Sequence, residues 1–246
     1  MQKKCGAALE ICRQVPDPSM RGHLFTQKLL LPKQYKQYQW LAFLDLDILI
    51  SKYAPSIFDY AQADKGLGAI VEARDDDCFL LANKRWFKQT PEQIPTPDQI
   101  FAQRGFAPTV TPLKTFNGGV ILCQPALVAD LFADYYWEIT KNPTGFLMSE
   151  ELPMGYLTQT TDLFFALDPK FNQQMIYLLA DKKTTYPFYL TRLQQKINKR
   201  LNRFFKRHEP FIFGQYARVV EKALKNNYIV HFSGNFPIPP NLNNAL

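Results

Sequence analysis

LAFLDLDILIS, from Leu41 to Ser51, is the stretch that decides the predicted fold of this chain. Its near-continuous apolar character is typical of a central strand that helices cover on both faces. Asp45 and Asp47 interrupt it, and on a regular strand residues two apart point the same way, so their carboxylates are expected side by side. Neighbouring carboxylates repel and resist desolvation, so they need a cation, strong donors or a shared proton. A divalent metal is the simplest of these three.

The whole chain has the length and composition of one large α/β domain. It has 246 residues, of which 46% are hydrophobic and 21% are charged, so we expect a packed core rather than disorder. The longest apolar runs are shorter than the roughly 18 residues that span a bilayer. The first residues, MQKKCGAALEIC, lack the apolar segment of a signal peptide. The sequence therefore favours a cytoplasmic protein with a single domain over residues 1–246.

Cysteines and charge restrict the chemistry further. No CxxC pair and no zinc-finger spacing is found among the four cysteines, which are Cys5, Cys12, Cys78 and Cys123. This pattern favours reduced structural thiols over disulfides or zinc. The net charge of +7 favours anionic partners. Charge alone does not separate nucleotide phosphates, acidic lipids and nucleic acids.

Apolar periodicity and the positions of proline and glycine predict the other elements. Helices are expected at residues 3–15, at 24–31 before Pro32, after Pro125, and at 155–168. Strands are expected at 66–73, 120–123 and 228–232, and residues 88–112 are expected to form a long loop. Helices that alternate with strands in this way indicate an α/β fold.

A basic amphipathic helix is predicted at residues 191–207, TRLQQKINKRLNRFFKR. Seven Lys or Arg side chains surround its apolar stripe, which consists of Leu193, Ile197, Leu201, Phe204 and Phe205. Such a helix is suited to an anionic membrane surface. A solvated helix whose stripe packs on the core fits the same pattern, so both interpretations stay open.

Three short motifs carry the predicted chemistry: DLD at 45–47, NGG at 117–119 and HFSG at 231–234. In open α/β sheets ligands gather at the carboxyl ends of strands, where Asp47 and His231 are both expected. Two carboxylates and one imidazole suit a divalent first-row ion such as Mn²⁺, held together with phosphate oxygens. Taken singly, NGG is interpreted as a turn and His231 as a packed histidine. The acidic run at 75–77 is interpreted as a solvated loop.

In this order the motifs resemble those of metal-dependent nucleotide-sugar glycosyltransferases of the GT-A fold. The resemblance runs from about Leu24 to Pro237 and is carried by FTQKLLLP, LAFLDLDILIS, TFNGGVILCQPAL, EELP, KFN and IVHFSGNFP. Glycosyltransferase family 8, which includes glycogenin and bacterial lipopolysaccharide galactosyltransferases, is most similar, and family 34 follows it. The resemblance implies a Rossmann-like α/β fold with a mixed, mostly parallel sheet between helices.

The resemblance also assigns roles to individual residues. It implies that Asp45, Asp47 and His231 bind Mn²⁺, or Mg²⁺, which holds the donor diphosphate. The donor-binding residues that it implies are Lys28, Asn117, Gly118, Gly119 and Gly234. Glu151, or Glu150, would be the acidic catalytic residue beside the reacting sugar.

The function implied is transfer of a sugar from a nucleotide-sugar donor, with a UDP-sugar favoured, to a hydroxyl of a glycan, lipid or protein. A metal that neutralises the leaving diphosphate stabilises the transition state more than the ground state. The resemblance implies retention of anomeric configuration. No side chain identifies itself as a covalent nucleophile, which leaves same-face attack by the acceptor hydroxyl with Glu151 orienting the sugar or acting as base. Contact with an anionic membrane is a further expectation, and nucleic acid is not an expected partner.

The chain departs from the family 8 pattern at three places. Gly118 stands where the family more often has Ser, residues 235–237 provide no diphosphate-binding Lys, and no first strand is found before Lys3. These departures keep open a degenerate or truncated transferase fold that binds glycan, nucleotide or membrane without turnover. A haloacid-dehalogenase-like phosphohydrolase also places DxD after an apolar strand, with the first Asp as nucleophile and the second as acid or base. Leu49 stands where those enzymes normally have Thr or Val.

Overall fold

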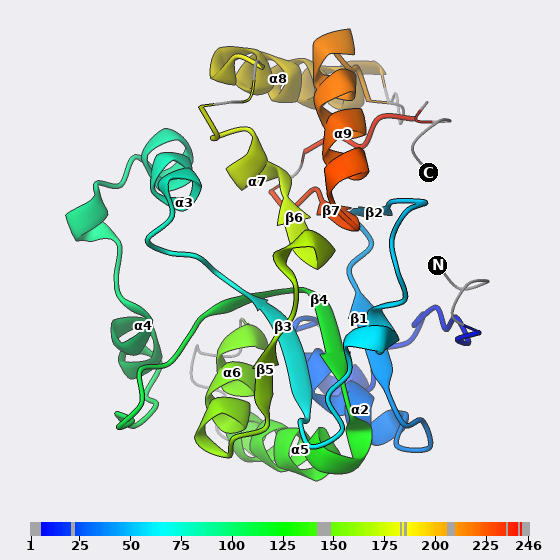
Figure 1. Ribbon diagram of the computed structural model, residues 1–246, viewed down its shortest axis with the longest axis vertical. Coiled ribbons are helices and arrows are strands. Elements are labelled where there is room, and N and C mark those ends of the chain that lie inside the picture. The colour runs from blue at the N-terminus through cyan, green and yellow to red at the C-terminus, as the bar shows by residue number, and fades with distance from the viewer. Residues whose placement is uncertain are drawn as a thin grey trace. The chain divides into compact units, whose positions relative to one another are not determined.

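The computed structural model describes residues 6–20, 23–141, 149–182, 184, 186–205, 210–234, 236–240 and 242. It is an α/β protein in which mixed sheets are flanked by helices (Figure 1). The chain divides into two compact units. The first comprises Met1–Leu44, Ser56–Glu72 and Pro95–Asp168, and the second comprises Asp45–Pro55, Ala73–Ile94 and Pro169–Leu246.

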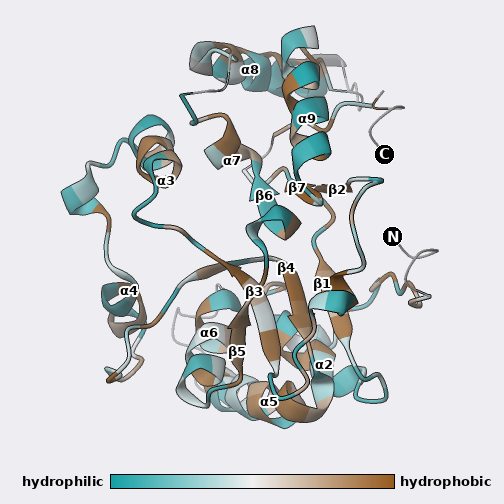
Figure 2. Cartoon of the chain, in the orientation of Figure 1, coloured by the Kyte–Doolittle hydropathy of each residue, from teal (hydrophilic) through white to brown (hydrophobic). Residues whose placement is uncertain are grey.

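The first unit is built on a four-stranded sheet in the order β1-β4-β3-β5. Its strands are β1 (Leu41–Leu44), β3 (Leu67–Val71), β4 (Phe116–Cys123) and β5 (Phe164–Ala166). β1 and β3 both pair antiparallel with β4, whereas β5 pairs parallel with β3. Hydrophobic residues dominate these strands (Figure 2). Most of β3 and β4 is buried.

Helices pack on this sheet through a continuous apolar core. Val128 and Phe132 of α5 (Pro125–Lys141) and Met154 of α6 (Glu151–Thr160) join Leu67 and Ile121 of the strands. The shorter helical segments of this unit are η1 (Pro18–Met20), η2 (Thr26–Leu30), α2 (Leu31–Gln34), η3 (Ile57–Tyr60) and α4 (Pro97–Gln103). β4 is therefore held within the sheet, and η2 and α6 pack on the same apolar core.

The second unit contains a three-stranded sheet in the order β2-β7-β6. Its strands are β2 (Ile48–Ile50), β6 (Gln173–Gln174) and β7 (Ile229–His231). Its helical segments are α3 (Asp77–Ala82), the π-helical turn η4 (Asn83–Phe87), η5 (Pro91–Gln93), η6 (Pro169–Asn172), α7 (Met175–Leu178), α8 (Phe188–Phe205) and α9 (Gly214–Asn226). Its core includes Met175, Tyr216, Val220, Val230 and Phe232. Across the described residues, no helix combines the length and apolar character needed to cross a membrane.

The stretch Leu41 to Ser51 is not one strand. β1 ends at Leu44 and pairs with β4, whereas β2 begins at Ile48 and pairs with β7. Leu46 lies between them and is 96% exposed. The prediction of a regular strand through Leu46 is wrong because the two halves of the apolar run belong to two different sheets.

The mixed pairing of strands is confirmed, but the expectation of a mostly parallel sheet is wrong. Within the described ranges, three of the five strand pairings are antiparallel. An apolar run indicates that both faces of a strand are buried, and parallel sheets have this property most often. Apolar character does not fix strand direction or position: β1 and β2, which the run at 41–51 forms, pair antiparallel, stand at the ends of their sheet orders and are only partly buried.

Several predicted elements differ from the observed ones. The helix expected at 155–168 ends at Thr160, since Asp162 has a left-handed φ of 57° and Phe164–Ala166 is the strand β5. The expected loop at 88–112 contains α4. Pro32 does not end a helix but lies in the first turn of α2, where a missing N–H has no cost.

The predicted N-terminal and basic helices have different outcomes. Residues 6–15 contain no helix, and residues 3–5 lie outside the described part of the chain. The basic helix predicted at 191–207 corresponds to α8, which begins at Phe188 and is described to Phe205. Residues 206 and 207 lie outside the described ranges.

Candidate functional site

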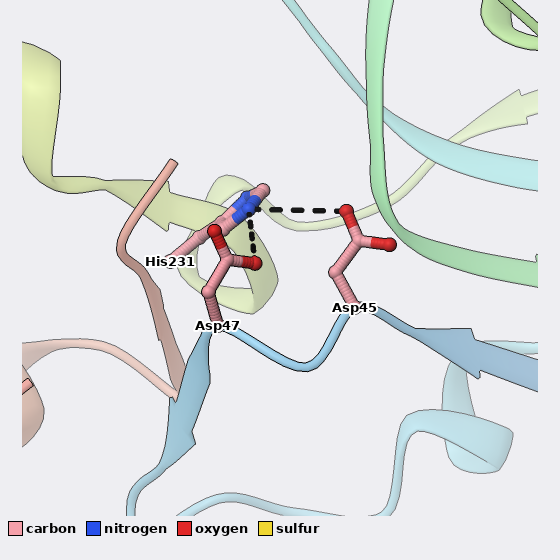
Figure 3. A group of neighbouring side chains, drawn as sticks. All are labelled: Asp45, Asp47 and His231. Atoms are coloured by element: carbon pink, nitrogen blue, oxygen red, sulfur yellow. Dashed lines mark ion pairs between the residues drawn. The ribbon is translucent and has the colours of Figure 1, made fainter. Parts of the chain in front are cut away.

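Asp45, Asp47 and His231 lie together in the second unit, and we call them the metal triad (Figure 3). The Nε2 atom of His231 is 3.2 Å from Oδ1 of Asp47 and 3.9 Å from Oδ2 of Asp45. One ligand atom from each of the three residues lies within 4.8 Å of the other two. Figure 3 shows both carboxylates directed toward the imidazole ring.

Strand pairing explains why these three residues meet. β2 runs antiparallel to β7, and Ile48 is the partner of His231. The backbone N–H of Phe232 donates to the carbonyl oxygen of Asp47 at 2.8 Å, which extends the pairing by one residue. The turn at Leu46 then brings Asp45 back toward the same imidazole.

Asn172 fixes the orientation of His231. Its Oδ1 is 3.0 Å from Nδ1 of His231, and both residues are almost fully buried. With the amide oxygen as acceptor, Nδ1 carries a proton and Nε2 presents its lone pair to the two carboxylates. KFN was part of the sequence resemblance, but no role for Asn172 was predicted from it.

The donor atoms of the metal triad suit a divalent ion. Two carboxylates supply hard oxygen ligands, and the imidazole supplies a nitrogen that first-row ions accept readily. The amide oxygen of Asn172 behind the imidazole is the kind of supporting contact that metal-binding histidines make. The residues present therefore fit the ion that the sequence resemblance implies.

A second polar cluster lies in the first unit, and we call Lys28, Glu150 and Glu151 the Lys28 group. The Nζ atom of Lys28 is 2.7 Å from Oε1 of Glu150, and only 10% and 5% of the two side chains are exposed. The same Nζ lies 4.4 Å from the centroid of the Phe43 ring and 3.4 Å from the carbonyl oxygen of Gly118. Lys28 comes from η2 and Glu150 immediately precedes α6.

Glu151 has an unusual protonation equilibrium for a carboxyl group. Burial raises the pKa of Glu151 to about 7, and the neighbouring carboxylates of Glu150 and Glu72 act in the same direction. The backbone N–H of Gly118, which donates to Oε1 of Glu151 at 2.6 Å, and the charge of Lys28 oppose the shift. Near neutral pH, the Glu151 carboxyl group is therefore present in both its protonated and its ionised form.

The NGG motif lies in an irregular part of β4 rather than in a turn. Ala69 of β3 pairs with Ile121, but the next residue, Ile70, pairs with Asn117, so the residues 118–120 oppose no residue of β3. Such bulges redirect side chains and backbone and are frequent beside active sites. The Oδ1 of Asn117 accepts from the N–H of Gly119 at 3.0 Å, which stabilises the irregular backbone.

Gly118 is explained by the glutamates that pack on it. A Cβ atom at this position would lie 2.7 Å from Oε1 of Glu150 and 3.0 Å from Cγ of Glu151. A serine, which family 8 more often has here, would displace the Lys28 group in this chain. The departure at Gly118 is thus coupled to the close approach of Glu150 and Glu151.

The predicted site residues fall into two groups within the described part of the chain. The metal triad lies in the second unit, where Gly234 forms a turn with φ of 86°. Lys28, Asn117, Gly118, Gly119, Glu150 and Glu151 lie in the first unit. The pairing of Lys28 with Glu150 was not predicted, because these residues lie 122 positions apart with no pattern to connect them. The roles of all these residues stay predictions.

Comparison with known proteins adds a set of similar folds. No family model and no curated protein matches this sequence. The bifunctional glycosyltransferase WbbM is 12% identical over 87% of this chain and 32% of its own, with a TM-score of 0.49. The galactosyltransferase LgtC, in complex with donor and acceptor sugar analogues, is 15% identical over 86% of this chain and 59% of its own, with a TM-score of 0.45. Mouse xyloside xylosyltransferase 1 is 17% identical over 87% of this chain and 64% of its own, with a TM-score of 0.39.

These solved structures are glycosyltransferases, and this chain spans less than two thirds of the length of each. Their TM-scores are below 0.5 and their identities are below 25%. A likeness of this level does not identify the activity of this chain.

Proposed function

We propose that this chain is a metal-dependent glycosyltransferase of the GT-A type that transfers a sugar from a nucleotide-sugar donor to an acceptor hydroxyl. The observation that supports it most directly is the convergence of Asp45, Asp47 and His231 from two segments 184 residues apart. Two acidic side chains around one imidazole have little value for stability, because neighbouring carboxylates repel. They are useful where a cation and a phosphate ligand are bound.

In this proposal the metal triad holds a divalent ion, with Mn²⁺ favoured over Mg²⁺. When bound, such an ion neutralises the negative charge that grows on the leaving diphosphate. Asp45 and Asp47 supply oxygen ligands, and His231 supplies Nε2. Asn172 keeps the imidazole in the orientation and tautomer that ligation needs.

The Lys28 group and the NGG bulge would act on the donor. Lys28 and Gly234 are assigned to donor binding by the sequence resemblance, together with Asn117, Gly118 and Gly119. Glu151 has a pKa of about 7, which suits a group that accepts and returns a proton or orients a sugar hydroxyl near neutral pH. Glu150 is neutralised by Lys28 and would hold that lysine in place.

The proposal also covers the donor, the acceptor and the location of the protein. A UDP-sugar is the favoured donor, and the acceptor is a glycan, lipid or protein hydroxyl, with retention of configuration. The protein is proposed to act in the cytoplasm, as a single domain, at the inner surface of a membrane.

Release of nucleoside diphosphate from a panel of sugar nucleotides, with and without Mn²⁺, tests the proposal. We expect Mn²⁺-dependent release from at least one UDP-sugar, lost in EDTA and in Asp47→Asn. Asp75→Asn is the matched control, because Asp75 is an exposed aspartate of the same unit outside the metal triad. Turnover in EDTA equal to that in Mn²⁺ would contradict the proposal.

A binding protein without turnover is the second candidate, favoured by one observation. Lys28, which the resemblance assigns to the donor, is buried against Glu150. Mn²⁺-dependent thermal stabilisation by a sugar nucleotide without any release of nucleoside diphosphate would support this alternative, since ligands that bind the native state raise its apparent stability. The haloacid-dehalogenase-like alternative gives no role to His231 and would show itself as hydrolysis of a generic phosphate ester.

A further inference from the structure

One face of α8 carries a dense basic surface in the described part of the second unit. At 100° per residue, an arc of about 120° contains seven residues of α8, and all seven are exposed: Tyr189, Arg192, Leu193, Lys196, Lys199, Arg200 and Arg203. No Asp or Glu occurs anywhere between positions 182 and 208. Five cations and two apolar side chains thus share one face without a compensating acid on the helix.

Contacts on the opposite side of α8 hold this face outward. Thr191 and Gln194 are buried, and Oε1 of Gln194 accepts from the N–H of Phe213 at 2.8 Å. Asn198 accepts from the N–H of Phe211 at 2.6 Å and donates to its carbonyl oxygen at 3.1 Å. Leu193 belongs to the apolar stripe for which a membrane surface and the core were both left open, and it is 44% exposed. The core-facing side is instead centred on Gln194, so Leu193 belongs to the basic face.

The π-helical turn η4 is attached to α8 next to this face. The guanidinium Cζ of Arg192 lies 4.8 Å from the centroid of the Trp86 ring, and its Nη2 donates to the carbonyl oxygen of Trp86 at 3.3 Å. Arg85 donates from Nη1 to the carbonyl oxygens of Leu179 and Ala180, which fixes the turn from its other side. With Trp86 and Arg85 directed inward, the turn exposes Lys84, Phe87 and Lys88, and Phe87 is 61% exposed.

We propose that the basic face of α8 and the turn at 84–88 form one docking surface for an anionic lipid bilayer. Basic side chains beside exposed Phe87, Tyr189 and Leu193 are the composition of an interfacial helix, whose cations meet lipid phosphates while its apolar side chains enter the headgroup region. Phe87 and Tyr189 could also stack on bases, but the aliphatic side chain of Leu193 has no aromatic face for stacking and gains only from an apolar phase, which favours lipid over nucleic acid. The inference does not depend on the proposed activity.

Sedimentation of the full chain with vesicles tests the surface. One set of vesicles contains phosphatidylcholine alone, and in the other about a third of the lipid is anionic phosphatidylglycerol. We expect binding only to the anionic vesicles, weakened by salt. The triple variant Lys196→Gln, Lys199→Gln, Arg200→Gln should lower the partition coefficient about 100-fold, since each cation contributes roughly fivefold. Lys84→Gln with Phe87→Ala should lower it about tenfold if the turn belongs to the surface.

The matched control removes the same charge from another helix of the same unit. Arg218, Lys222 and Lys225 are exposed on α9, and their replacement by Gln should leave vesicle binding within about twofold of the wild type. An equal loss in this control would show that net charge alone drives binding and would overturn the proposal. The proposal would also be overturned if the wild type did not bind anionic vesicles, or if it bound RNA and not the vesicles. Unchanged far-ultraviolet circular dichroism would show that each variant is folded.

Discussion

The metal triad and the Lys28 group hold acidic side chains in opposite ways. In the metal triad, the side chains of Asp45 and Asp47 are 26% and 48% exposed and face an imidazole. In the Lys28 group, Glu150 is 5% exposed and lies against an ammonium group supplied by the chain itself. The first arrangement is open to a cation from solution, and the second contains its own. Adding or removing a metal should therefore change the first and leave the second unaltered.

Loss of a metal ligand is expected to have the largest effect. Asp47→Asn keeps the size of the side chain but removes its charge, and should lower both turnover and Mn²⁺ affinity by more than about 100-fold, the upper limit for loss of a supporting residue. Calorimetric titration with Mn²⁺ and the diphosphate-release assay measure the two quantities. Asp75→Asn should behave as the wild type. If Asp45→Asn and Asp47→Asn both retain wild-type affinity, the metal binds elsewhere.

Replacement of Lys28 should lower the free energy of unfolding, and this effect should not require a bound metal. Lys28→Met leaves Glu150 buried without its cation, which costs about 3 to 5 kcal/mol in the free energy of unfolding. Urea denaturation in EDTA measures it. Replacing both partners, Lys28→Met with Glu150→Leu, should recover most of the loss, because two well-packed apolar side chains replace a buried ion pair at little cost.

Lys33→Met is the control for this prediction. Lys33 is half exposed and lies 3.5 Å from exposed Asp130, so its loss should change stability very little. Equal effects of Lys28→Met and Lys33→Met would mean that Lys28 is not buried with Glu150 in solution.

Glu151 should make stability depend on pH. Its pKa is raised from an ordinary 4.5 to about 7, so between these values the folded state keeps a proton that the unfolded state has lost. Stability therefore falls as pH rises from about 4.5 to 7. The free energy of unfolding of Glu151→Gln should exceed that of the wild type by up to about 3 kcal/mol above pH 7. Near pH 4 the free energies of unfolding of the variant and the wild type should be equal. If their difference stays constant between pH 4.5 and 7, the Glu151 carboxyl group is solvated.

The smallest expected effect concerns the residue behind the metal triad. Asn172→Ala removes the acceptor of His231 Nδ1 and should weaken Mn²⁺ binding by about 10- to 100-fold. Asn227→Ala is its control, because Asn227 also makes a side-chain hydrogen bond, donating from Nδ2 to the carbonyl oxygen of Ala223 at the end of α9, away from the metal triad. Affinity should fall in the first variant only. An equal fall in both would assign the effect to a general loss of stability.

Sequence motifs predicted which residues meet more reliably than they predicted the backbone that brings them together. DLD and HFSG were expected at neighbouring carboxyl ends of strands. His231 is the last residue of β7, whereas Asp47 directly precedes β2, and the two meet because these strands pair antiparallel. The regular strand through Leu46 was not observed, because an apolar run does not reveal that its two halves pair with different partners.

The unpredicted parts depend on contacts between distant positions. The bulge that contains NGG exists through its register with β3, and glycine is equally common in turns. The segment LFFALD continued a helical pattern, but the pairing of its residues Phe164–Ala166 with β3 makes them a strand. Nothing local to Asn172 signals that it faces His231, because the two residues are 59 positions apart. That both belong to motifs of the same resemblance did not indicate a contact between them.

Leu46 makes the metal triad observable. Its side chain is 96% exposed and points away from core packing, although it is flanked by two residues that turn toward His231. A cysteine placed there, in a chain whose Cys5, Cys12 and Cys78 have been replaced, would accept a spin label or a fluorophore at a side chain that makes no core contact. Paramagnetic Mn²⁺ in the triad would then relax or quench that probe from a few ångströms away. The position that the DLD motif leaves unspecified is thus the one from which metal binding can be followed spectroscopically.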